Sequence, residues 1–108
     1  MKKGGAWLIV MLLVLSMVAV DASAEPQSFR IGVCQLVQHA ALEDATQGFI
    51  DAVTQQLGEQ CDISVQNASG DPASCISIVN AFLAEDVDLI LANSTQALQA
   101  ASAATGET

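Results

Sequence analysis

The stretch Val87–Ala92 reads V-D-L-I-L-A, and it decides the fold class of this 108-residue chain. Its leucine-isoleucine-leucine run indicates a strand that is apolar on both faces, as the strands of parallel sheets are. Asn93-Ser94-Thr95 follows at once and offers side chains that cap a helix, which we expect to continue to about Ala104. The sequence here predicts a buried strand whose carboxyl end leads directly into a helix.

Two further strand–helix units precede this one. Phe29–Cys34 and Cys61–Gln66 have the alternating apolar residues of strands. Ala40–Leu57 carries apolar residues at steps of three and four, which is typical of one face of a helix. Asp71 and Pro72 form an N-cap and first-turn pair that begins the second helix. Three such units with short connections predict an α/β fold with a parallel three-stranded sheet and right-handed crossovers.

The spacing of apolar residues also predicts which side of each helix packs on the sheet. Gly58 stands after the first helix, where a left-handed C-terminal residue is expected. In the second helix, three further apolar residues lie beside the apolar stripe that is expected to face the sheet. The expected inner faces are Leu42, Ala45, Phe49, Val53 and Leu57 in the first helix, and Ile76, Val79 and Leu83, with Cys75, Ile78 and Phe82 beside them, in the second.

Residues 1–24 have the pattern of a secretory signal peptide. Lys2 and Lys3 precede an uncharged run over residues 6–20, and Ala22-Ser23-Ala24 supplies the small residues that signal peptidase requires. A membrane anchor is the alternative, but the run has 15 residues, fewer than the roughly 20 that cross a bilayer. We expect cleavage after Ala24, which leaves residues 25–108 as the mature, exported chain.

The expected mature chain is strongly acidic. Removing residues 1–24 takes Asp21, Lys2 and Lys3 from the chain's 12 acidic and 3 basic residues, which leaves eleven acids against Arg30 alone and a net charge of −10. Such a surface repels nucleic acid and anionic membranes, so neither is expected as a partner. The acids are scattered along the sequence, as on an ordinary solvated surface.

Cys34, Cys61 and Cys75 are too few for a disulfide scaffold and lack the C-x-x-C spacing of a metal site. Export would bring them into an oxidising compartment, where one pair could form a disulfide and leave one cysteine over. The alternative, which we favour, is three small buried thiols. We expect no metal and no cofactor.

Three blocks, in order, resemble the ABC-transporter substrate-binding family whose members are associated with tryptophan, tyrosine or related ligands. The family typically reads close to I-G-I-x-Q-x-x-E-H-P-A-L-D, followed by a helix with G-F-x-x-A, and it carries a Q-N-A-x-G-D turn. Gln38 and Ala40 depart from this pattern, since glutamate and proline are usual there. The matching blocks are I-G-V-C-Q-L-V-Q-H-A-A-L-E-D-A-T-Q-G-F-I-D-A (31–52), Q-N-A-S-G-D-P (66–72) and V-D-L-I-L-A-N-S-T-Q-A-L-Q-A (87–100).

The resemblance implies the fold of a type I periplasmic binding protein, in which two α/β lobes joined by a hinge clamp a ligand between them. Residues 25–108 would then form part of the N-terminal lobe, and the chain would be a fragment. The implied role is that of a periplasmic or other extracytoplasmic solute-binding component of an ABC importer, with an amino acid or similar solute as ligand and a permease as partner. Such a protein is not an enzyme.

In a doubly wound sheet, ligands bind beyond the carboxyl ends of the strands, where successive helices change faces. The expected strand order 2-1-3 places this crevice between the ends of the first and third strands. Gln35 ends the first strand, and Asn93, Ser94 and Thr95 end the third. A helix N-terminus suits a carboxylate, so we expect an amino-acid carboxylate to rest on Ser94 and Thr95. The alternative is that both residues only cap the helix.

His39 and Asn67 complete the expected ligand-binding set. His39 lies in the loop before the first helix, where it could line the cleft or cap the helix. Asn67, which follows Gln66 at the end of the second strand, could contact the ligand or only form the turn. His39 has no second acid, base or thiol at catalytic spacing, so no residue is expected to be catalytic.

Two other classes of protein share this order of elements. A nucleotide-binding enzyme would carry G-x-G-x-x-G after the first strand, where this chain has Gln35-Leu-Val-Gln38. A small exported α/β interaction protein that dimerises is the remaining alternative. Gel filtration separates it from a fragment, because a fragment with an apolar edge strand is expected to aggregate.

Overall fold

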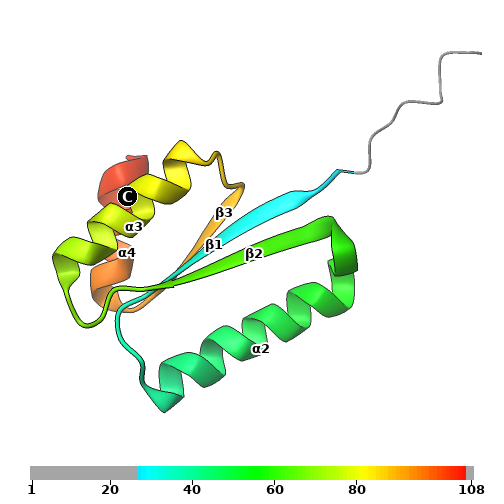
Figure 1. The fold of residues 1–108 in the computed structure, drawn as a ribbon, viewed down its shortest axis with the longest axis horizontal. Coiled ribbons are helices and arrows are strands. Elements are labelled where there is room, and N and C mark those ends of the chain that lie inside the picture. The colour runs from blue at the N-terminus through cyan, green and yellow to red at the C-terminus, as the bar shows by residue number, and fades with distance from the viewer. Residues whose placement is uncertain (1–26, 107–108) are drawn as a thin grey trace, which may run out of the picture.

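Three parallel strands form the centre of the structure, a computed structural model that describes residues 27–106. The strand order is β2-β1-β3, as predicted. One helix covers one face of the sheet and two helices cover the other (Figure 1). The elements in chain order are β1 (Phe29–Gln35), α2 (Ala40–Leu57), the 3₁₀ turn η1 (Gly58–Gln60), β2 (Cys61–Asn67), α3 (Pro72–Ala84), β3 (Leu89–Asn93) and α4 (Thr95–Thr105).

This architecture confirms the predicted α/β class and the parallel three-stranded sheet. It fits part of the first lobe that the resemblance implies, with α2 on one face and α3 and α4 on the other. The predicted signal peptide lies outside the described residues. Within residues 27–106, no helix is both long enough and apolar enough to span a membrane.

The third strand differs from its prediction in bounds and in burial. Val87 does not pair with the sheet, because its amide donates to the carbonyl of Phe82 at 3.2 Å and closes the turn after α3. The ladder with β1 starts at Leu89, opposite Ile31. Leu89 is 51% exposed, so the expectation of burial on both faces was wrong. The reason is that β3 forms an edge of the sheet within the described chain.

The buried faces of the two long helices agree only in part with the predicted ones. In α2, the predicted Leu42, Phe49, Val53 and Leu57 are half-buried, but Thr46 is buried in place of Ala45. In α3, Ile76 is 53% exposed and Leu83 is 38% exposed, so they do not form the inner stripe. The residues that α3 buries are Cys75, Val79 and Phe82.

Gly32 sets the rotation of α3, because its missing side chain leaves room for Phe82. A β-carbon at position 32 would come within 2.5–2.8 Å of the Phe82 ring. Phe82 is 2% exposed and belongs to the core cluster with Cys34, Cys75 and Val79. The core therefore lies mainly between β1 and the α3–α4 layer.

The predictions for the start of α3 and the end of α2 had different outcomes. Asp71 caps α3 as expected, since its Oδ1 accepts from the amide of Ala73 at 3.0 Å and its Oδ2 from the hydroxyl of Ser74 at 2.9 Å. These bonds to Ser74 and Ala73 lower the pKa of the Asp71 carboxyl. Gly58 has the expected positive φ of 55°, but its ψ of −128° lies outside the left-handed helical region. The prediction of a left-handed C-terminal residue was therefore wrong at Gly58.

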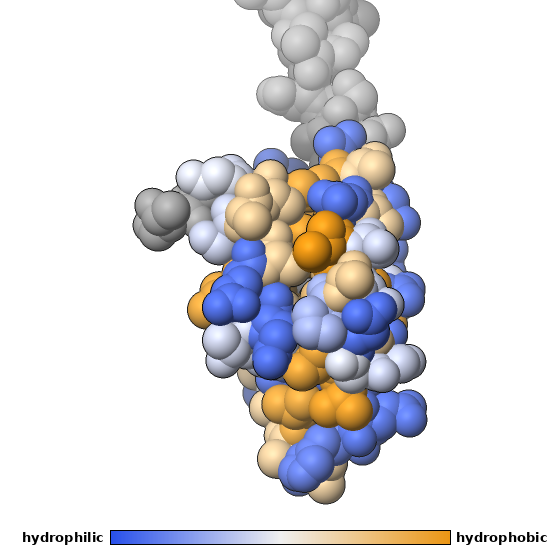
Figure 2. Space-filling view, turned by 90° about the vertical axis from the view of Figure 1, so that its left-hand side faces the viewer, coloured by the Kyte–Doolittle hydropathy of each residue, from blue (hydrophilic) through white to orange (hydrophobic). Residues whose placement is uncertain are grey.

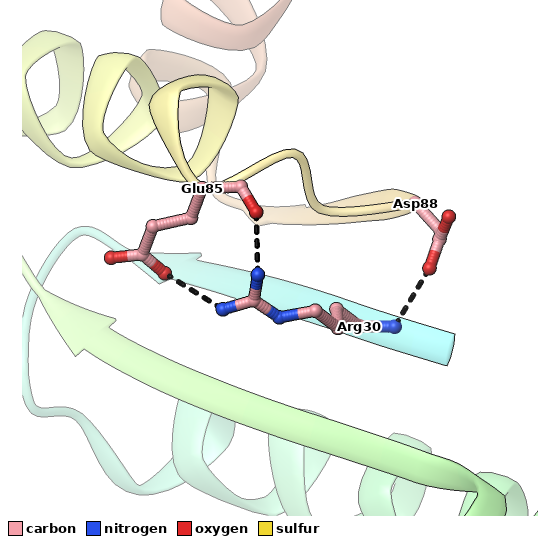
Figure 3. A network of polar contacts seen from close by, with 3 residues as sticks. All are labelled: Arg30, Glu85 and Asp88. Atoms are coloured by element: carbon pink, nitrogen blue, oxygen red, sulfur yellow. Dashed lines mark hydrogen bonds and ion pairs between the residues drawn. The ribbon is translucent and has the colours of Figure 1, made fainter. Parts of the chain in front are cut away.

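Arg30 joins the amino end of β1 to the segment between α3 and β3 (Figure 3). Its Nη1 donates to the carbonyl of Glu85 at 2.6 Å, and its Nη2 lies 3.7 Å from the Glu85 carboxylate. Two hydrogen bonds with Asp88 complete the network. The Arg30 amide donates to the side-chain Oδ2 of Asp88 at 2.8 Å, and the Asp88 amide donates to the Arg30 carbonyl at 2.8 Å. The one arginine of the chain is thus engaged at the amino end of the sheet.

The surface mixes polar and apolar side chains. Seen from the left of Figure 1, apolar patches lie between hydrophilic ones (Figure 2). On α3 and α4, Ile76, Leu83 and Leu98 are exposed apolar residues, and Leu98 is 60% exposed.

We predict that Gly32→Ala destabilises the fold, because the new methyl group meets the ring of Phe82 in a packed core. Overpacking of this kind costs about 1–3 kcal/mol of unfolding free energy. Gly48→Ala is the matched control, since it adds the same methyl in α2 where no atom lies within 4 Å. It should stabilise the helix by about 0.5–1 kcal/mol. Urea denaturation of both variants checks this, and equal effects would contradict the close approach of α3.

Candidate functional site

Three amide side chains lie side by side where the strands end. In the parallel register, Gln35 of β1 pairs with Asn67 of β2 on one side and with Asn93 of β3 on the other. Residues at one level of a sheet project from the same face, because the strand pleat alternates with period two. This row of amides faces α2.

Thr46 of α2 connects two members of the row. Its hydroxyl donates to Oε1 of Gln35 at 2.9 Å and accepts from Nδ2 of Asn93 at 2.8 Å. Asn93 also donates from Nδ2 to the carbonyl of Leu42 at 2.8 Å, and Gln35 donates from Nε2 to the carbonyl of Val37 at 3.0 Å. The hydrogen bonds run continuously from β3 through α2 to β1.

This network is buried and complete. Gln35 is 4% exposed and Thr46 is 5% exposed. Within residues 27–106, no buried side-chain nitrogen or oxygen lacks a hydrogen-bond partner. Because an unpaired buried polar group costs about 1–3 kcal/mol, the network holds the N-terminal half of α2 against the carboxyl edge of the sheet.

A hollow of about 460 Å³ opens beside the network, between α2 and the ends of β1 and β2. Amide side chains supply much of its polar lining, and Glu43 is the one acidic residue in it. Two apolar residues, Ile50 and Val65, complete a lining that suits a small solute with both polar and apolar parts. The full lining is Gln35, Gln38, Glu43, Thr46, Gln47, Ile50, Val65 and Asn67.

A larger hollow of about 620 Å³ lies along the outer side of β3 and α4. Its lining is mostly apolar and includes Leu83, Ile90 and Leu98, with Asp88 as its one charged residue. Its three polar lining residues, Asp88, Ser102 and Thr105, are outnumbered by apolar ones, and none of them lies at the carboxyl end of a strand. The candidate site is therefore the hollow at the carboxyl edge.

His39 and Asn67 hold local structure at this edge. Nδ1 of His39 accepts from the amide of Ala41 at 3.2 Å, so His39 is the N-cap of α2. Oδ1 of Asn67 accepts from the amide of Ser69 at 2.8 Å and forms the turn that follows β2. Both residues lie at the expected edge, and Asn67 also lines the hollow. Ligand contact by either one stays a prediction.

Ser94 is the N-cap of α4, and its hydroxyl oxygen accepts from the amide of Ala97 at 3.0 Å. Capping uses the oxygen as an acceptor and leaves the hydroxyl hydrogen able to donate. Thr95 is exposed in the first turn. The predicted ligand contact of Ser94 and its role as an N-cap are thus compatible, since one hydroxyl can cap the helix and also donate to a carboxylate.

The hollow lies beside the predicted crevice rather than within it. The prediction placed it between β1 and β3, whereas the hollow lies between β1, β2 and α2 and excludes Asn93, Ser94 and Thr95 from its lining. Asn93 still links the two places, because it precedes Ser94 in the chain and bonds to Leu42 and Thr46 of α2.

The sequence reasoning missed Thr46, Glu43 and Gln47. Thr46 could have been found, because it is a polar residue four positions after Leu42 and so lies on the same helix face. Glu43 and Gln47 share a face with each other in the same way, next to the first turn. Within residues 27–106, no group of three or more histidine, cysteine or acidic residues is placed to hold a metal ion.

Comparison with known proteins agrees with this architecture. The sequence model of the family described as ABC transporter substrate binding protein matches residues 30–108. The Tyrosine-binding protein of Clostridioides difficile (strain R20291) is 41% identical to this chain over 78 residues, which cover 69% of this chain and 23% of the relative. The chain thus spans less than a quarter of that relative's length. No solved structure matches.

We predict that Thr46→Val destabilises the fold by about 1–3 kcal/mol, because it leaves the buried Oε1 of Gln35 without a partner. It also removes one of the two acceptors of Asn93 Nδ2. Thr54→Val is the control, since Thr54 is an exposed threonine of the same helix and should change stability by less than about 0.5 kcal/mol. Urea denaturation measures both. Equal effects would show that the Thr46 hydroxyl does not connect the sheet to α2.

Proposed function

Because the chain belongs to the ABC transporter substrate-binding protein family, we propose that it forms one wall of the solute site of an ABC importer's binding component. Its carboxyl edge gathers polar side chains from three strands and the N-termini of α2 and α4. The observation that carries the proposal is the row Asn67–Gln35–Asn93, which sets these groups at one level of the sheet.

The charges of this edge favour a zwitterion over a simple anion. Arg30 is held at the opposite end of the sheet by Glu85, so it does not neutralise a ligand at the site. A ligand carboxylate would instead be stabilised by the N-terminus of α4, where amide hydrogens and the hydroxyls of Ser94 and Thr95 meet the positive end of the helix dipole. Glu43 offers the charge that pairs with an ammonium group.

The solute that we propose is an amino acid, and tyrosine is the first to test. The relative from Clostridioides difficile is named for tyrosine binding. Ile50 and Val65 give the hollow an apolar part, which suits a side chain with an apolar ring. His39, the N-cap of α2, and Asn67, which lines the hollow, complete the proposed contacts.

The remaining features of the role follow from the family. Proteins of this family are typically extracytoplasmic, so we propose that residues 1–24 direct export and that the mature chain works outside the cytoplasm. A second lobe would close over the solute and exclude water, and a permease would receive the solute. We propose that the chain binds without catalysing a reaction.

One alternative has its own observation in its favour. The apolar hollow beside β3 and the exposed Leu89 and Leu98 suit a small exported protein that dimerises through this side. Gel filtration of the chain separates the two, because a discrete dimer supports the alternative.

The test is a graft into the full-length relative. The matched 78-residue segment of the tyrosine-binding protein is replaced by the corresponding residues of this chain, and tyrosine binding is measured by titration calorimetry. We expect the graft to bind tyrosine. A graft that folds cooperatively and binds no amino acid would contradict the proposed function.

In the same graft, we predict that Ser94→Asp weakens binding by about tenfold or more. Aspartate caps a helix as well as serine does, so the graft should remain folded, but its charge repels a ligand carboxylate. A lost hydrogen bond to a charged group costs about 1.5–3 kcal/mol, and each 1.4 kcal/mol is about tenfold in affinity.

Gln60→Glu is the control for this substitution, because it adds the same charge in η1, at the opposite edge of the sheet. Its affinity should equal that of the unchanged graft. If Ser94→Asp also binds normally while its melting temperature is unchanged, Ser94 is only an N-cap.

A further inference from the structure

Two cysteines lie together in the centre of the core, apart from the solute site. Cys34 and Cys75 each have 0% exposure and belong to one buried cluster with Val79 and Phe82. Cys34 projects toward α3, whereas its neighbour Gln35 projects toward α2. The pair therefore lies behind the sheet as seen from the candidate site.

The packing of α3 on β1 brings these two side chains into contact. Gly32 meets Phe82, and Cys34 is two residues later on the same face of the strand. Cys75 is seven residues before Phe82, which is two turns earlier on the same face of the helix. The helix thus runs antiparallel to the strand, and the absent side chain at Gly32 allows the helix to approach the strand closely. The two thiols lie within hydrogen-bond distance of each other, and a disulfide further requires about 7 Å or less between their α-carbons.

The thiol chemistry agrees with this contact. Burial raises the pKa of the Cys34 thiol to about 12, and the neighbouring Cys75 adds to the rise through charge repulsion and a hydrogen bond. Both groups are thiols in the structure. A thiol with this pKa is protonated at neutral pH, so it reacts little while the core is closed.

Cys61 is in a different place. It begins β2 opposite Phe29, five residues before Cys34 on β1. At about 3.3 Å per residue of strand, this offset separates Cys61 from Cys34 by about 17 Å, far beyond the reach of a disulfide.

We propose that Cys34 and Cys75 form a disulfide that ties β1 to α3, and that Cys61 remains a free thiol. Two S–H bonds break and one S–S bond forms, and the two electrons and two protons pass to a small-molecule or protein disulfide that is reduced to two thiols. The inference rests on the proposed extracytoplasmic role for its oxidising compartment, and on no property of the solute site.

The burial of the pair determines when the bond forms and how it is lost. Exchange requires an accessible thiolate, so the bond forms while the chain folds, before α3 closes over β1. In the folded chain, a reductant in water reaches the bond only after local opening. A bond that resists reductant until denaturant is added is therefore a signature of this site.

The test is to refold the full chain in an oxidising glutathione buffer, denature it and alkylate the free thiols before mass spectrometry. We expect one alkylated cysteine in the parent chain and a cross-linked peptide pair that contains Cys34 and Cys75. Cys61→Ser should leave no alkylated cysteine, and it keeps Cys34 and Cys75 in place. Cys61→Ser combined with Cys75→Ala should show one.

Three alkylated cysteines in the refolded parent, or a cross-link that includes Cys61, would overturn the proposal. Circular dichroism of the parent before denaturation shows that it has folded, so the result does not depend on any variant. Thiol trapping detects the cross-link and never the solute, and calorimetry of the graft detects the solute and never the cross-link. Failure of either proposal is therefore distinguishable from failure of the other.

Discussion

The hydroxyl of Thr46 is the group on which the arrangement of the carboxyl edge depends. It is buried, donates to Gln35 of β1 and accepts from Asn93 of β3. Because two of its partners belong to strands far apart in the sequence, one hydroxyl relates α2 to both strands at once. Without it, Oε1 of Gln35 would be buried unpaired, which costs more than the hydrogen bond itself contributes.

The two faces of the sheet carry different kinds of side chain. The face toward α3 and α4 is closed by apolar packing, with Phe82 seated on the bare backbone at Gly32. The face toward α2 carries the amides and Thr46, and a hollow opens beside them. A strand shows alternate residues to the two faces, so Cys34 and Gln35 are neighbours in sequence yet serve the core and the edge separately.

Charge is also divided between the two ends of the sheet. Arg30 is engaged with Glu85 at the amino end, while the carboxyl end offers the N-termini of α2 and α4. Under the proposed function, a carboxylate at that end would be stabilised by amide hydrogens and hydroxyls rather than by a cationic side chain. This division fits the proposed solute with charges of both signs, since Glu43 lines the hollow.

The sequence alone determined the order of the elements, the parallel sheet and the residues that begin α3 and α4. These features depend on local chemistry, since Asp71 and Ser94 cap their helices through bonds within three residues. It also placed Gln35, Asn67 and Asn93 at strand ends, and so at one edge. Only the tertiary structure decided which residues at the margins of each helix face are buried and where the hollow opens.

The physical reason is that the rotation of a helix about its axis is set by partners distant in the chain. Gly32 turns Phe82 inward and leaves Ile76 exposed, and the strand-end amides turn Thr46 inward in place of Ala45. The spacing within α3 does not contain that information, and the spacing within α2 marks the helix face but not the strand-end partners of Thr46.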